Sequence, residues 1–143
     1  MVVVALIAIL AAIAAPSYQN FVTSNRITAE INGLVTHLQY ARSVAVKQGL
    51  NVTVTSNNGN NWSNGWTVAN ANGNLKQQQA FQGGDTLAAG LSVITYDRNG
   101  FTPNATTLTL NDQTNTVAFG KCVVVSAVGQ LSVFKRGASP LCP

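Results

Sequence analysis

The sequence MVVVALIAILAAIAAP, residues 1–16, decides the fold of this chain. Positions 1–15 contain no charged, hydroxyl or amide side chain, and Pro16 ends the run. As a helix rising 1.5 Å per residue, positions 1–15 would span about 22 Å, which is less than the roughly 30 Å hydrocarbon core of a bilayer. A soluble domain would bury only one face of such a helix and leave the rest in water. The segment is therefore expected to lie in lipid, to pack among identical segments of other chains, or to do both in turn.

Pro16 is expected to kink the helix and not to end it, because a helical pattern continues on both sides. The apolar run also differs from a secretory signal peptide, since no basic residue precedes it and the helical pattern runs on past its end. We therefore expect this helix to be retained in the working protein. Its abrupt start at Met1 predicts a few further residues upstream.

Beyond Pro16, apolar residues recur at spacings of 4, 3, 4, 3 and 4 positions, which is one stripe of an α-helix. The stripe consists of Ile27, Ile31, Leu34, Leu38, Ala41 and Ala45. Gly49 is a suitable C-terminal stop, and Arg26 and Glu30 are spaced to pair on the helix surface. The sequence predicts one helix of about 45 residues. Its first third is apolar all round, and the rest is amphipathic, with apolar residues on one face. This change indicates a change of surroundings, from lipid or partner helices to a globular domain.

From Leu50 onward the apolar period falls to two, and Asn-Gly turn dipeptides appear at 58–59, 72–73 and 99–100. About seven strands are expected, at 50–55, 65–68, 91–96, 106–110, 116–119, 122–128 and 131–134. Residues 76–90, which are rich in Gln and Gly, are expected to form a loop with room for an edge strand. The predicted fold class is α+β, a long N-terminal helix packed on a mostly antiparallel β-sheet.

The chain is expected to contain one apolar helical segment and one globular domain. The apolar segment covers residues 1–22, and the domain covers residues 23–143, with an amphipathic helix at 23–49 and the sheet at 50–143. Only 8% of the residues are charged, and Asn, Gln, Thr and Ser supply the polar surface. This composition suits extracellular or surface-assembled β-structure better than a cytosolic enzyme. The net charge of +4 is mild and does not by itself indicate nucleic-acid binding.

The two cysteines, Cys122 and Cys142, are expected to form a disulfide bond. An even count together with a membrane-anchoring N-terminus favours an oxidising compartment such as a bacterial periplasm. The bridge would close a loop of about 20 residues and stabilise the fold by about 3 kcal/mol. A metal site would need three or four ligands, and the only histidine, His37, is remote in sequence.

The sequence offers little for catalysis or for binding a cofactor. No motif pairs His37 with an activated Ser or Cys, so a structural role on the helix is expected for it. The acids Glu30, Asp85, Asp97 and Asp112 are scattered, and the glycines lie mostly beside Asn, as turns require. We therefore predict no catalytic, cofactor-binding or metal-binding residues and no enzymatic activity.

Two residue pairs have alternative interpretations. Trp62 and Trp66 could form a ligand platform, but burial between sheet and helix is the commoner role for aromatic residues in such strands. Lys135 and Arg136 could contact phosphates, whereas a solvated basic pair beside the disulfide is the simpler interpretation.

The segment MVVVALIAILAAIAAPSYQNF resembles the N-terminal helix of type IV pilins and type II secretion pseudopilins, starting a few residues after the beginning of that helix. In that family a leader ends in Gly and is followed by Phe-Thr-Leu-Ile-Glu-Leu, after which Met1 would come directly. Pro16 matches the family's helix-kinking proline. LQYARSVAVKQG at 38–49, Trp62 with GWTV at 65–68, and DRNG at 97–100 are similar to the FimT/GspH subgroup of minor pilins and pseudopilins.

The resemblance implies a pilin-like fold and the role of structural subunit in a type IV pilus or related filament. A prepilin peptidase would remove the leader, and the family's glutamate would lie two positions before Met1. The subunit would wait in the bacterial inner membrane with its domain facing the periplasm. It would then join other pilin subunits in a surface pilus or a periplasmic pseudopilus. The residues expected in the membrane and in the filament core are Val2, Val3, Val4, Leu6, Ile7, Ile9, Leu10 and Ile13.

A DNA receptor for natural transformation is the alternative that the resemblance implies. Some FimT-type proteins bind DNA through a C-terminal Gly-Arg-x-Arg pattern, which corresponds here to Gly129-Gln130-Leu131-Ser132. Both arginine positions hold uncharged residues, and this weakens the attraction to phosphates. Lys135 and Arg136, just downstream, are the candidate DNA contacts.

Overall fold

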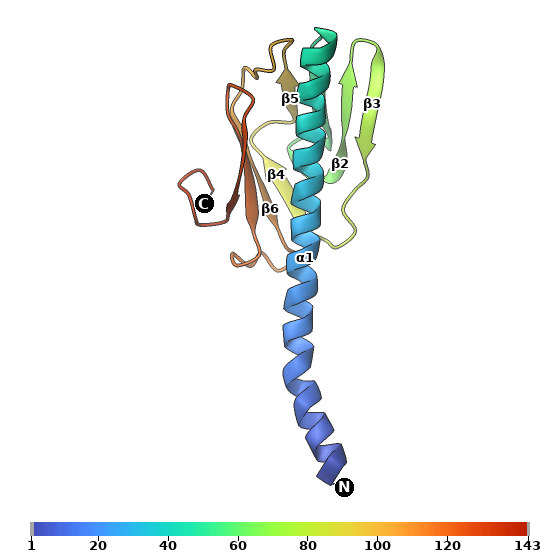
Figure 1. Ribbon diagram of the computed structural model, residues 1–143, viewed down its shortest axis with the longest axis vertical. Coiled ribbons are helices and arrows are strands. Elements are labelled where there is room, and N and C mark those ends of the chain that lie inside the picture. The colour runs from blue at the N-terminus through green and yellow to red at the C-terminus, as the bar shows by residue number, and fades with distance from the viewer. Residues whose placement is uncertain (1, 143) are drawn as a thin grey trace.

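One helix, α1 (Val2–Gln48), runs the length of the molecule, and the sheet lies behind its second half (Figure 1). The computed structural model describes the backbone of residues 2–142, and the side chains of that range except at positions 5, 6 and 8–16. Helical backbone continues without a break through position 16, so the prediction that Pro16 does not end the helix is confirmed. The predicted kink stays a prediction, since the Pro16 side chain lies outside the described ones, as do Leu6, Ile9, Leu10 and Ile13.

The predicted apolar stripe is the face of α1 that packs on the sheet. All six of its residues are buried, at 0% or 1% exposed: Ile27, Ile31, Leu34, Leu38, Ala41 and Ala45. The helix ends where predicted, because Gly49 adopts a left-handed φ of 66° and donates its N–H to the Ala45 carbonyl. The spacing of the apolar residues therefore located the packed face of this helix, and Gly49 located its end.

Eight strands form one sheet in which every pairing is antiparallel. They are β1 (Val52–Asn58), β2 (Asn61–Asn70), β3 (Gly73–Gln78), β4 (Thr86–Ala89), β5 (Val93–Tyr96), β6 (Thr106–Asn111), β7 (Lys121–Val125) and β8 (Leu131–Lys135). Their order is β5-β1-β2-β4-β6-β7-β8, with β3 paired to β2 beside β4. The first half of the sheet, β5-β1-β2-β3, joins the second half, β4-β6-β7-β8, through the single residue pair Asn61↔Ala88.

The prediction of a strand at 116–119 is wrong, because this segment is a turn. The Asp112 carboxylate accepts the hydroxyl and N–H of Thr114 and the N–H of Thr116, and these bonds curl the backbone away from the sheet. The N–H groups of Phe119 and Gly120 then both bond to the Thr116 carbonyl. The apolar residues of 116–119 resembled a strand only because the capping role of Asp112 was not recognised.

Residues 76–90 contain more strand than the expected loop. Their first part belongs to β3, which extends from the Asn72-Gly73 turn and pairs as an edge strand with β2. Their last part is β4, which aligns with β6 over Thr86↔Asn111 to Ala89↔Leu108. Neither strand is apolar enough to show a clear alternation, since only Leu87 of β4 reaches the core.

Both tryptophans lie in the core, which confirms their predicted burial. Trp62 and Trp66 are 0% exposed, with ring centroids 6.3 Å apart. Trp62 donates its indole N–H to the Leu91 carbonyl at 2.8 Å. Trp66 donates to Nδ1 of His37 at 3.1 Å, which ties the sheet to the helix. Each indole N–H is thus satisfied without a ligand.

Candidate functional site

The first candidate site is the part of α1 that extends beyond the domain, residues 2–22, here called the stalk (Figure 1). Its described apolar side chains are exposed, from 75% at Val2 and 61% at Ile7 to 42% at Val22. Val3, Val4 and Phe21 are likewise exposed. Among the side chains that the structure describes, no helical stretch has the length and hydropathy of a membrane span. An exposed apolar surface of this extent on one helix is unusual for a protein that works alone in water.

At the base of the domain, Arg26 makes a contact that sequence spacing did not predict. Its guanidinium donates to both carboxylate oxygens of Asp85, at 2.5 and 2.8 Å, and does not pair with Glu30 as expected. Asp85 is buried, and Gly83 leaves room for the arginine, since a Cβ there would lie 2.5 Å from Arg26 Nε. This ion pair holds the 79–85 loop against the helix just above the stalk.

Glu30 lies beside this pair. Its Oε2 atom is buried and makes no hydrogen bond within the described part of the chain. Burial and the nearby Asp85 carboxylate raise the pKa of Glu30 to about 7, although the Arg26 charge opposes the rise. The cluster therefore holds two carboxylates and one guanidinium, and Glu30 is the group that takes up a proton near neutral pH.

His37 has the structural role that was expected. Its Nδ1 accepts the Trp66 indole N–H, and its ring packs edge-on against the Trp66 ring at 5.8 Å. Burial, with a smaller effect from Lys76, lowers the pKa of His37. The imidazole is thus held neutral, with Nδ1 as the acceptor. Within residues 2–142 no group of three or more His, Cys, Asp or Glu side chains could hold a metal ion.

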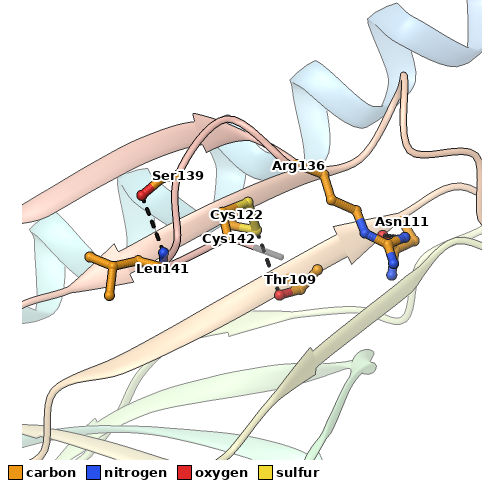
Figure 2. The surroundings of a disulfide bond; sticks show 7 residues. All are labelled: Thr109, Asn111, Cys122, Arg136, Ser139, Leu141 and Cys142. Carbon is orange, nitrogen blue, oxygen red and sulfur yellow. Dashed lines mark hydrogen bonds between the residues drawn. A yellow bond between two sulfur atoms is a disulfide. The ribbon is translucent and has the colours of Figure 1, made fainter.

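The C-terminal tail is fixed by the predicted disulfide, Cys122–Cys142 (Figure 2). Both cysteines are 0% exposed, and the chain between them turns back through Ser139, whose hydroxyl accepts the Leu141 N–H. Thr109 Oγ1 lies 3.6 Å from Cys122 Sγ. The bridge covers the face of β6, β7 and β8 that points away from the helix.

The two predicted DNA contacts differ in their surroundings. Lys135 is exposed at the end of β8. Arg136 is half-buried, and its guanidinium lies beside Asn111 (Figure 2). It donates to the side-chain oxygens of Asn111, at 2.9 Å, and Asn115, at 2.6 Å. Its aliphatic part lies over Gly120, where a Cβ would come within 2.9 Å of Arg136 Cδ. The structure therefore gives Arg136 an internal role.

Gly129, the first residue of the stretch compared with Gly-Arg-x-Arg, is a close-packing residue. A Cβ there would lie 2.0 Å from the Gly100 carbonyl oxygen. Arg42 from the helix donates to the carbonyls of Gly100, at 3.0 Å, and Val128, at 3.1 Å. Sequence reasoning marked Gly100 as a turn residue but gave no signal that its turn touches the one at Gly129, or that Arg42 joins them.

Three comparisons place these features among known proteins. The family model of the type II transport protein GspH matches residues 30–129. The type IV minor pilin FimU of Pseudomonas aeruginosa PAO1 has a similar fold in two crystal forms. The P21 form has a TM-score of 0.69 and 22% identity over 77% of this chain and 89% of that chain. The P65 form has a TM-score of 0.60 and 21% identity over 78% and 90%. No curated protein matches the sequence.

Proposed function

The chain belongs to the GspH family of the type IV pilin and pseudopilin superfamily, and we propose that it is a structural filament subunit without enzymatic activity. The filament is a type IV pilus or a related secretion pseudopilus, and the partners are other pilin subunits. The observation that carries this proposal is the stalk, whose described apolar residues remain 42–75% exposed in the single chain.

The stalk has two suitable environments in succession. Before assembly it lies in the bacterial inner membrane with the domain on the periplasmic side, after a prepilin peptidase has removed a leader. Each Leu, Ile or Val contributes about −0.3 to −0.6 kcal/mol to insertion at the centre of a membrane helix. Leaving the membrane is therefore unfavourable unless the stalk is buried again among other subunits. Its many alanines permit close approach of neighbouring helices.

The proposal is tested by placing a charge on the stalk in cells that express the complete gene. Val4→Lys puts an unpaired charge on an apolar helix, at a cost of about 2.5–3.5 kcal/mol at a bilayer centre. We expect the variant to disappear from sheared filament preparations, as followed by immunoblot. Asn32→Lys is the matched control, since Asn32 lies on the exposed face of the same helix within the domain. Assembly of Val4→Lys at the wild-type level would refute the filament role.

A further inference from the structure

Four Asn-Gly dipeptides occur in the chain, at 58–59, 64–65, 72–73 and 99–100. In such a dipeptide the backbone nitrogen of the glycine can attack the side-chain amide carbon of the asparagine, because glycine has no Cβ to hinder the approach and its backbone rotates freely. The attack needs an exposed dipeptide whose glycine N–H is not bound to an acceptor. These requirements rank the four dipeptides by their surroundings in the fold.

Three of the four glycines are held by the fold. Gly65 is buried in β2, where a Cβ would lie 2.1 Å from a backbone oxygen of β3. Gly100 is also buried, and it donates its N–H to the Asp97 carbonyl at 2.9 Å. Gly73 is the fourth residue of the turn that starts at its register partner, Asn70, and a turn uses the N–H at this position for its closing hydrogen bond. Attack by any of these nitrogens would first have to break contacts of the sheet or of a turn.

Gly59 has a different place in its turn. It is the second residue of the turn that closes at the Asn58↔Asn61 pair, and its N–H makes no hydrogen bond within residues 2–142. Asn58 and Gly59 are both exposed, and open space surrounds the position of a Cβ on Gly59. The side-chain amide of Asn58 also has no hydrogen-bond partner among the described residues, since only its backbone N–H is bound. Both reacting groups are therefore free.

The turn at 58–61 is only loosely joined to the rest of the hairpin. The register of β1 and β2 is interrupted between Ser56 and Asn58, so the Asn58↔Asn61 pair stands apart from the continuous ladder. The Ser56 hydroxyl accepts the Asn58 N–H at 3.3 Å and donates to the Asn61 carbonyl at 2.9 Å. Breaking these two bonds lets the turn rotate while the ladder beyond Ser56 stays paired.

We propose that Asn58 is a site of spontaneous deamidation in the folded protein. The Gly59 nitrogen forms a bond to Cγ of Asn58 while the bond from Cγ to Nδ2 breaks. The amide nitrogen leaves as ammonia and carries away the proton that the Gly59 nitrogen loses. Water then opens the five-membered succinimide ring at either of its two carbonyl carbons, which gives aspartate or isoaspartate. Overall, one asparagine and one water yield one acidic residue and one ammonia.

The reaction would change both the charge and the backbone of the β1–β2 hairpin. It adds a carboxylate to a chain that has four acidic residues and lowers the net charge from +4 to +3. Isoaspartate also inserts a methylene group into the main chain next to the Asn58↔Asn61 pair. The inference concerns the folded domain of a single chain, so it stands or falls independently of the proposed filament function.

The test compares the folded and the denatured chain in the same mildly alkaline buffer. The whole 143-residue chain is kept folded in detergent micelles, and a second sample is kept unfolded in guanidinium chloride until half of its Asn-Gly sites have reacted. Tandem mass spectrometry assigns each deamidated site. We expect similar conversion at all four sites in the unfolded sample. In the folded sample, Asn58 should react about tenfold faster than Asn64, Asn72 and Asn99, because those three need a further hydrogen bond or packing contact to break.

Two results of this comparison would overturn the proposal. One is a folded sample in which Asn58 has no product when the unfolded sample is half converted. The other is a folded sample in which the four sites react at equal rates, or in which another site reacts faster than Asn58.

Two variants test the route by which Asn58 reacts, with circular dichroism to confirm that each is folded. Ser56→Ala removes both hydroxyl bonds of the turn and should raise the rate at Asn58 about tenfold, with the other three sites unchanged. Gly59→Ala places a methyl group beside the attacking nitrogen and should lower the rate at Asn58 about tenfold. An unchanged rate in Gly59→Ala would refute attack by the Gly59 nitrogen. An equal rise at all four sites in Ser56→Ala would refute reaction through the local turn.

Discussion

Where α1 meets the 79–85 loop, the Glu30 carboxyl lies beside the Arg26–Asp85 ion pair, and the proton on Glu30 links this contact to pH. The pKa of Glu30 rises from its ordinary value of 4.5 to about 7 in the folded chain. The folded state therefore binds the proton more tightly than the unfolded state. The stabilising contribution is complete below about pH 4.5 and is lost as the pH rises through 7.

We accordingly expect the urea midpoint of the wild-type protein to fall between pH 5 and pH 8 by more than that of Glu30→Gln. The amide of the variant stays neutral at every pH, so its contribution does not titrate. His37 acts in the opposite direction, since its lowered pKa favours the fold at higher pH, but this effect is common to both proteins. The same pH dependence in both proteins would show that Glu30 is not the titrating group.

Arg136 is expected to matter for stability more than for DNA binding. Arg136→Ala would leave Asn111 and Asn115 without their guanidinium donor and should cost about 1–3 kcal/mol of unfolding free energy. Lys135→Ala, which changes an exposed side chain, should cost less than about 0.5 kcal/mol. Urea unfolding measures both costs, and a salt series of gel shifts with duplex DNA measures any binding. Loss of DNA binding in Arg136→Ala without loss of stability would instead support the DNA-receptor alternative.

Among the elements, the contact between the 97–101 and 126–130 turns depends on having no side chain at Gly129. Gly129→Ala would place a methyl group 2.0 Å from the Gly100 carbonyl oxygen, in a backbone conformation with a φ of 73°. We expect a loss of about 2 kcal/mol or more, because strain and a displaced turn add together. Gly59→Ala is the control, since it has a φ of 54° but open space around it, and should cost about 1–2 kcal/mol. Equal losses of unfolding free energy in the two variants would mean that the two turns can move apart at little cost.

The elements that could be predicted are those that the spacing or the type of residues in the sequence indicates directly. The spacing of Ile27 to Ala45 fixed the packed face of α1, and the two cysteines fixed the tail. The contacts that could not be predicted depend on residues far apart in sequence. Arg26 selects Asp85, 59 residues away, over Glu30 four residues away, and only the folded sheet brings the 79–85 loop to the helix. In the same way, β4 has too few apolar residues to be recognised before its pairing with β6 is known.

For the molecule as a whole, the disulfide is expected to stabilise one half of the sheet only. It lies on β7 and the tail, whereas the half formed by β5, β1, β2 and β3 pairs with the other half in the sheet at Asn61↔Ala88. Cys142→Ser should lower the unfolding free energy by about 3 kcal/mol. The rate of amide hydrogen exchange through partial unfolding should rise in β7 and β8 and change little in β1 and β5. A uniform rise over all strands would show that the two halves open as one unit.

The same bridge sets how far the molecule can lengthen under a mechanical load. A pull between the stalk and the chain end reaches the sheet through α1, and the strands can then peel away one after another. The 20-residue separation between Cys122 and Cys142 stays closed by a covalent bond, which withholds about 70 Å of extended chain from the pulled length. In a protein under tension, the disulfide therefore limits the maximum length of the extended chain. Reduction of the disulfide would free these residues to extend, and the unfolding step in a force-extension trace would become longer.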